Sequence, residues 1–188
     1  QIVRQEIQQE LDNIRQAWQW SSEDRALSAL SEGLGGLARF YELSGLFREA
    51  ESLFHDTIIA ISDADPAVDV FIHRLEIERA SALFAQGLLE QASVLASEIV
   101  DRTEADATDT ANSAEILQQR RDNEAAARFE LARSLHKRGL QVEATQHYQL
   151  ALPLAQQGEN RHLEADILRY WCWNCYDRAE FDQALALN

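Results

Sequence analysis

Residues that break helices and residues that form cross-links are scarce in this sequence. Its 188 residues include two prolines, seven glycines, two cysteines and no methionine. Because helices tolerate proline and glycine least, a chain poor in both and rich in Ala, Leu, Glu and Gln favours an all-helical fold. The missing methionine and the start at Gln1 lead us to expect a piece cut from a larger protein.

Signals for export and membrane insertion are missing as well. The first residues show no signal-peptide pattern, and the chain has no run of about eighteen apolar residues, so we expect no membrane span. Two thiols without a signal sequence favour a cytoplasmic protein.

Positive charge is low. The chain carries 17 Lys and Arg residues against 32 Asp and Glu, which gives a net charge of −15 and a pI near 4.6. Nonspecific binding to nucleic acid or to an anionic membrane requires a basic face, so we expect neither as a direct partner.

Motifs for catalysis and metal binding are absent from the sequence. The histidines show no His-x-x-x-His spacing, and there is no Gly-x-Ser-x-Gly or Walker motif. Gly35-Gly36 follows no predicted strand, so it does not indicate a phosphate loop. Cys172 and Cys175 form a Cys-x-x-Cys, but only His162 lies near them, which favours reduced thiols packed in the core over a zinc or redox site. We therefore expect no enzymatic activity, no metal and no cofactor.

A six-residue pattern is present four times. It begins with glycine after an apolar helical stretch and ends with alanine, at 45–50, 87–92 and 139–144, and more weakly at 179–184 with alanine at both ends. Glycine suits the left-handed position just past a helix end, where a side chain costs about 1 kcal/mol or more. The alanine suits a point where the next helix crosses close to the first. Four copies in register predict an array of helix-turn-helix repeats.

Other positions recur at fixed distances from these hinges. Four residues before each hinge is a bulky or sulfur side chain: Tyr41, Leu83, Leu135 and Cys175. Seven residues before is a small side chain, with a cysteine in the last copy: Ala38, Ala80, Ala132 and Cys172. Four residues after the alanine come Phe54, Ala96 and Tyr148.

This arrangement resembles the tetratricopeptide repeat (TPR). The resemblance implies an all-α fold of antiparallel helix-turn-helix repeats that form a right-handed superhelix. The hinges are 42, 52 and 40 residues apart, whereas the family's usual period is about 34. The consensus tryptophan of the first helix is also missing from every copy, so the array is divergent.

We predict a single repeat domain over residues 1–188. Its parts are a leading helix (1–22), repeat 1 (24–62), repeat 2 (65–102), a flexible acidic linker (103–113), repeat 3 (114–157) and a truncated repeat 4 (159–188). The linker holds nothing to bury. Pro153 is predicted to kink or end its helix. The helix around Trp171 is apolar on most sides, so we expect a further part of the parent protein to cover it.

The segment from Glu10 to Trp20 reads ELDNIRQAWQW. It resembles a helix that opens the helical array after the ATPase core in signal-transduction ATPases with numerous domains (STAND proteins), which are multidomain bacterial regulators. The resemblance covers about eleven residues and implies a sensor or interaction arm. An ordinary amphipathic cap helix explains the same residues equally well.

In TPR arrays the first helix of each pair lines a concave groove. Carried onto this register, the groove-facing positions are Glu32, Arg39, Glu42, Arg74, Ser81, Phe84, Phe129, Arg133, His136, Lys137, Arg169, Tyr170, Trp173 and Tyr176. From these we predict seven partner-binding residues: Arg39, Phe129, Arg133, Lys137, Arg169, Tyr170 and Trp173. Guanidinium groups and aromatic rings suit carboxylates, phosphates or peptide side chains. Alternatively, Phe129, Tyr170 and Trp173 pack against neighbouring helices.

Two functions follow as hypotheses. The first is a non-catalytic protein-interaction or sensor domain of a larger signalling ATPase or transcription regulator, which binds a protein or peptide partner, or a small-molecule inducer, and contacts domains outside these residues. The alternative is a free-standing TPR adaptor, a scaffold that assembles other proteins. The lysine and asparagine clamp of co-chaperone TPR domains is absent from the matching positions.

Overall fold

A computed structural model describes residues 11–62, 66–106 and 113–187, and within these ranges the regular secondary structure is entirely helical. The helices are α2 (Leu11–Glu23), α3 (Leu27–Ser44), α4 (Phe47–Ile61), α5 (Pro66–Ala85), α6 (Leu89–Asp106), α7 (Ala114–Lys137), α8 (Gln141–Gln157), α9 (Arg161–Asp177) and α10 (Phe181–Ala186). The predicted all-α fold is therefore confirmed. No helix in the described ranges is long and apolar enough to cross a membrane.

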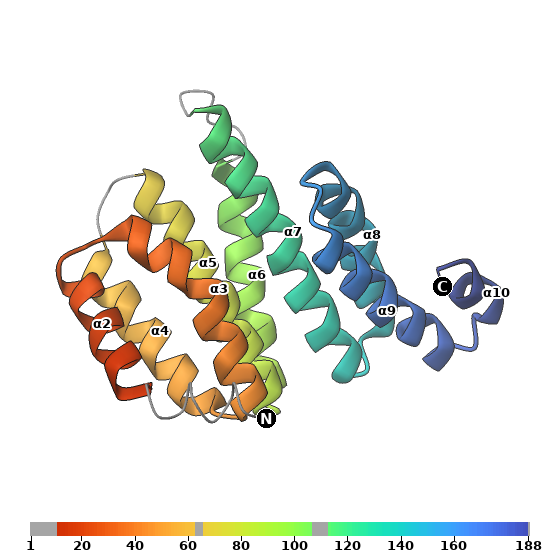
Figure 1. Cartoon of the computed structure of the whole chain (residues 1–188). Helices are drawn as coiled ribbons and strands as arrows, with labels where there is room; N and C mark the ends of the chain where they lie inside the picture. The colour runs from red at the N-terminus through yellow and green to blue at the C-terminus, as the bar shows by residue number, and fades with distance from the viewer. Residues whose placement is uncertain (1–10, 63–65, 107–112, 188) are drawn as a thin grey trace.

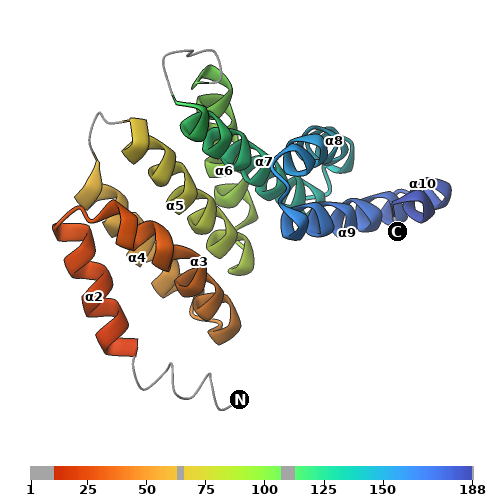
Figure 2. The ribbon, with the colours of Figure 1, turned by 45° about the horizontal axis from the view of Figure 1, so that its top comes forward.

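The helices pack in pairs, and the pairs follow one another in chain order (Figures 1 and 2). Helices α3 and α4, α5 and α6, α7 and α8, and α9 and α10 contact each other within their pairs. The first helices of successive pairs also contact, α3 with α5, α5 with α7, and α7 with α9. These first helices therefore form a continuous row.

The hinges have the predicted backbone conformation. Gly45, Gly87 and Gly139 have φ angles of 71°, 78° and 84°, and Ala179 has a φ of 59°. In each hinge the next residue donates its N–H to the carbonyl of the bulky or sulfur residue five positions earlier: Leu46 to Tyr41, Leu88 to Leu83, Leu140 to Leu135 and Glu180 to Cys175. This bond closes each helix end by satisfying a carbonyl that the helix leaves free.

The alanine five residues after each hinge lies where the paired helices cross. All four alanines are buried: Ala50, Ala92, Ala144 and Ala184. Around them the core forms two clusters, one spanning α2 to α5 and the other spanning α5 to α10. A larger side chain at these positions would push the two helices apart.

Helix α2 is attached to the first pair by a tryptophan. Trp18 is buried, and its indole N–H donates to the Thr57 hydroxyl on α4 at 2.8 Å. Its ring also meets Phe54 edge to face. Residues 1–10, which include the predicted start of the leading helix and Glu10 of the STAND-like segment, lie outside the described residues.

The structure differs from the sequence-based expectation in two places. Helix α6 continues to Asp106, four residues into the predicted linker, because Thr103 is buried and bonds the carbonyl of Val100. Residues 107–112 of that linker lie outside the described residues, and its last residue, Ser113, caps the start of α7 by accepting a hydrogen bond from the Ile116 N–H. Helix α8 does not end at Pro153 but runs to Gln157. The carbonyl that Pro153 leaves without a donor belongs to Gln149, which is exposed, so solvent can satisfy it.

Candidate functional site

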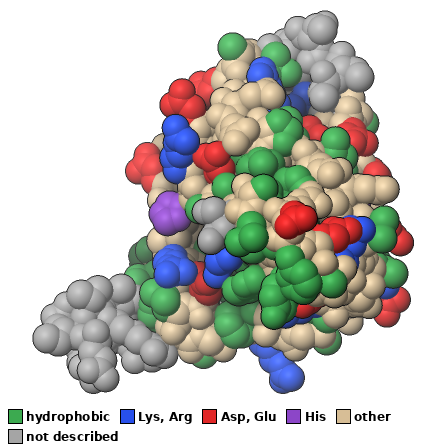
Figure 3. Space-filling model, turned by 90° about the vertical axis from the view of Figure 1, so that its right-hand side faces the viewer, with side chains coloured by type: hydrophobic (Ala, Val, Ile, Leu, Met, Phe, Trp, Pro, Cys, Tyr) green, Lys and Arg blue, Asp and Glu red, His purple; other side chains and the backbone are tan. Residues whose placement is uncertain are grey.

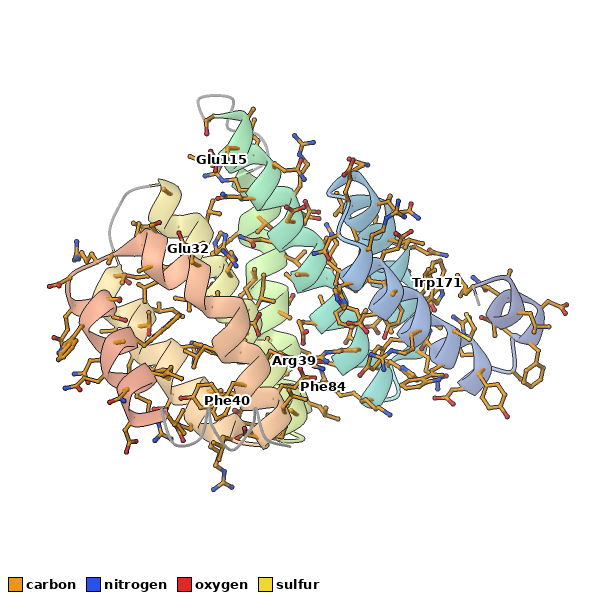
Figure 4. All side chains as sticks on the ribbon, in the orientation of Figure 1. Glu32, Arg39, Phe40, Phe84, Glu115 and Trp171 are labelled. Carbon is orange, nitrogen blue, oxygen red and sulfur yellow. The ribbon has the colours of Figure 1, made fainter. Side chains whose placement is uncertain are left out.

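A cleft of about 410 Å³ opens between the row of first helices and α4. Its lining residues come from α3, α4, α5, α7 and α9: Gly35, Ala38, Arg39, Tyr41, Glu42, Phe47, Ala50, Phe54, Glu78, Ser81, Ala82, Phe84, Ala85, Arg133 and Tyr170. Figure 4 labels Arg39 on α3 and Phe84 on α5, which lie close together at the same end of their helices. We call this space the cleft below. It contains residues from all four helix pairs.

Arg133 is a partly buried residue of α7 that joins α7 to α5. Its Nε donates to the carboxylate of Glu130 at 2.8 Å, and its Nη2 donates to the Ser81 hydroxyl on α5 at 2.8 Å. Burial lowers the pKa of Arg133, but Glu130 and Tyr170 together raise it by more, so the guanidinium stays charged. Most of its hydrogen-bonding capacity is therefore used inside the protein.

The same guanidinium lies against two aromatic rings. It is 4.2 Å from the centroid of Phe84 and 5.4 Å from the centroid of Phe129. Cation–π contacts at partly buried sites stabilise by roughly 1 to 2 kcal/mol. Phe129 is buried, so it supports the arginine from behind and does not itself line the cleft.

Helix α9 extends this stack of rings and cations. Tyr170 meets Phe129 edge to face at 5.4 Å and meets Trp173 at 5.2 Å. Arg169 lies over both α9 rings, at 4.9 Å from Tyr170 and 5.6 Å from Trp173, and pairs with Asp166. Trp173 keeps 47% of its surface exposed. The alternative reading, that these rings pack between helices, describes Phe129 and Tyr170 well and Trp173 only in part.

The remaining predicted residues differ in their placement. Arg39 is exposed at the edge of the cleft and pairs with Glu42 on the next turn of α3. Lys137 is exposed in the last turn of α7 and is not part of the cleft lining. Of the seven predicted residues the structure thus brings Arg39, Arg133 and Tyr170 to the cleft, with Phe129, Arg169 and Trp173 stacked beside it.

Sequence reasoning missed a carboxyl group in the cleft, that of Glu78 on α5. Burial raises its pKa to about 7, and repulsion from Glu130 adds to the effect, while Arg74 and Arg133 oppose it. None of the hydrogen bonds and ion pairs among the described residues involves the Glu78 carboxyl. A carboxyl set among buried groups with no bonded partner is unusual, and strongly raised pKa values of this kind cluster at functional sites.

The local sequence does not single out this group. Glu78 lies in the mixed run Glu76-Ile77-Glu78-Arg79-Ala80 of α5, in which Ile77 and Ala80 are buried. Helix α5 contacts α3, α4, α6 and α7, so most of its circumference is covered by protein. An acidic residue in a helix that is covered on most sides is a candidate functional residue.

Comparison with protein-family models, with curated proteins and with solved structures finds no match for this chain. Both cysteines are free thiols, and Cys175 is buried. Within the described ranges no group of three or more His, Cys, Asp and Glu side chains is arranged to hold a metal ion.

Proposed function

We propose that this chain is a non-catalytic binding module that takes a segment of a protein partner, or a small-molecule inducer, in the cleft. One observation carries the proposal: the cleft is lined from all four helix pairs, by residues such as Arg39, Phe84, Arg133 and Tyr170. Concave sites with aromatic walls and a few charged groups are the usual form of ligand sites. Aromatic and arginine side chains also dominate the energetics of protein interfaces.

The position of the cleft, across all four helix pairs, supports a role in sensing. A ligand that touches α3, α5, α7 and α9 at once favours whichever stacking of the four pairs suits it best. Such differential binding is what shifts a conformational equilibrium. In a larger signalling ATPase or transcription regulator of the cytoplasm, as the STAND-like segment implies, the shift would pass to the other domains.

A free-standing TPR adaptor is the second candidate, and the far end of the array favours it. Figure 3, which faces the α10 end, shows hydrophobic side chains gathered among charged ones. Tyr176, Phe181 and Leu185 are all more than half exposed there. An adaptor uses two surfaces, and exposed apolar groups of this kind mark protein contacts. The coding sequence on either side of these residues separates the candidates: a nucleotide-binding core supports the signalling ATPase.

The experiment that tests binding in the cleft compares two tryptophan substitutions. Ala85 is exposed and lines the cleft, so Ala85→Trp should fill part of it without disturbing the core. Ala165 is exposed on α9 outside the cleft, so Ala165→Trp is the matched control. Proteins and small molecules retained from an extract by the wild-type chain and both variants are quantified by mass spectrometry. A ligand lost only with Ala85→Trp supports the proposal, and one retained by all three places binding elsewhere.

A further inference from the structure

The cleft carries one more carboxyl group than its arginines neutralise. Arg133 is paired with Glu130, and Arg39 is paired with Glu42. Glu78 is left without an ion pair. Glu78 is half-buried in the cleft wall, where the loss of hydration disfavours an unpartnered carboxylate and so favours either its protonation or the approach of a cation from outside.

Arg74 is the other arginine that acts on Glu78, and it is engaged elsewhere. It lowers the pKa of Glu78 through its charge. However, its Nη1 donates to the Ser31 hydroxyl at 2.8 Å, and its guanidinium lies 6.0 Å from the ring of Phe71. The Glu78 oxygens therefore keep their capacity to accept hydrogen bonds from a ligand.

The walls of the cleft are aromatic. The rings that line it are Tyr41, Phe47, Phe54, Phe84 and Tyr170. Tyr41 and Phe54 are almost fully buried behind the surface, so Phe47, Phe84 and Tyr170, which are half-buried, supply the accessible ring surface. Aromatic faces attract ammonium and guanidinium groups, and Phe84 already shows this behaviour towards Arg133. Rings beside an unpaired carboxyl group form an environment that suits a positive charge on an apolar stem.

We propose that the cleft takes a cationic group, an ammonium or a guanidinium, which the Glu78 carboxylate binds while the aromatic rings enclose its apolar stem. This inference rests on the proposed function and names the chemistry of the ligand. The cation belongs either to a lysine or arginine side chain of a partner or to a free amine or guanidine. Anionic ligands, which Arg39 and Arg133 suggest from the sequence, are disfavoured because both arginines are already paired.

Binding of a cation should depend on pH. Charged and titratable groups face Glu78 from its own helix and from three others. They are Arg74 on α5, Arg39, Tyr41 and Glu42 on α3, Glu130 and Arg133 on α7, and Tyr170 on α9. Helix α4 lines the cleft only with Phe47, Ala50 and Phe54, which do not titrate. None of the five histidines lines the cleft. With its pKa at about 7, Glu78 is mostly protonated at pH 6 and mostly ionised at pH 8. Affinity for a cation should therefore rise about tenfold over this range.

The test is an NMR titration of the whole chain with matched probes. Butylammonium and butylguanidinium supply the free cation, and acetyl-Ala-Arg-Ala-amide supplies it on a peptide. Butylurea is the neutral isostere, and pentanoate is the anionic control. Glu78→Gln removes the charge at nearly constant shape, and Glu98→Gln, exposed on α6 outside the cleft, is the matched control variant.

We expect the cations to shift signals of the cleft residues, with butylurea and pentanoate binding at least about tenfold more weakly. Glu78→Gln should weaken cation binding by about tenfold at pH 8 and remove its pH dependence, whereas Glu98→Gln should change neither. Tighter binding of the peptide than of butylguanidinium points to a protein partner, and the reverse points to a free amine or guanidine.

Three results would overturn the assignment: equal binding of butylurea and butylguanidinium, unchanged cation affinity in Glu78→Gln, or no shift with any probe. In the first two cases the cleft still binds a ligand, so the proposed function stands and only its cationic chemistry fails. In the third case the comparison of Ala85→Trp with Ala165→Trp decides the proposed function separately.

Discussion

The Nε–H of Arg133 donates to the carboxylate of Glu130, one turn earlier on α7, at 2.8 Å. Glu130 is buried and Arg133 largely so, and burial raises the pKa of Glu130 while the guanidinium opposes the rise. This pair stands where α7 faces α5 and α9, with Ser81 and Tyr170 as its neighbours. The arginine that the sequence suggested as a ligand-binding group is thus also part of the packing.

Arg133→Glu should therefore destabilise the fold as well as alter the cleft. The substitution removes the partner of Glu130 and places a second carboxyl beside it, and breaking a buried pair in this way costs about 3 to 5 kcal/mol. Urea unfolding followed by circular dichroism measures the loss. The control is Arg169→Glu, because Arg169 is exposed and its pair with Asp166 should contribute less than about 1 kcal/mol. Equal stability of the two variants would contradict the structural role of Arg133.

Glu78→Gln should stabilise the fold in a pH-dependent way. Burial raises the pKa of Glu78 from 4.5 to about 7, so between these pH values the folded state holds a proton that the unfolded state releases. The free energy of unfolding of the wild-type chain therefore falls as pH rises from about 4.5 to 7, by up to about 3 kcal/mol. The variant should match the wild type near pH 4 and exceed it at pH 8 in urea unfolding. A gain of the same size at both pH values would show that ionisation is not the cause.

Ala179→Gly should stabilise the last hinge. Ala179 has a φ of 59°, in the region where a Cβ costs about 1 kcal/mol or more. Because α10 has six residues and follows this hinge directly, the gain should be seen as slower amide exchange in α10. The reverse change, Gly139→Ala, should destabilise by a similar amount, since Gly139 has a φ of 84°. Faster exchange in Ala179→Gly would contradict this account.

Ala144→Leu should destabilise the third pair. Ala144 has no exposed surface and lies where α8 crosses α7, so extra methyl groups must push the helices apart at a cost of about 1 to 3 kcal/mol. Thermal unfolding gives the comparison. Val142→Leu, two residues earlier and 60% exposed, adds a methylene group on the solvent side of the same helix and should leave the melting temperature nearly unchanged.

Backbone requirements explain why the sequence predicts so much of the fold. A left-handed residue after a helix strongly prefers glycine, and a close helix crossing requires a small residue, so Gly87 and Ala92 mark one hinge and crossing in the sequence itself. The groove register placed Arg39, Arg133 and Tyr170 at the cleft for the same reason, since it counts from the hinges. Lys137 shares that register with Arg133 but lies in the last turn of α7, beyond the cleft.

The sequence by itself determined the helical class, the hinges and the alanine crossings, because each depends on sterics within a few neighbouring residues. The pairing of charges was decided only by the tertiary structure. Among 32 acidic residues, nothing local shows that Glu130 pairs with Arg133 while Glu78 remains unpaired. That outcome depends on how α5 and α7, whose residues Ser81 and Arg133 are 52 positions apart, rotate and pack against each other.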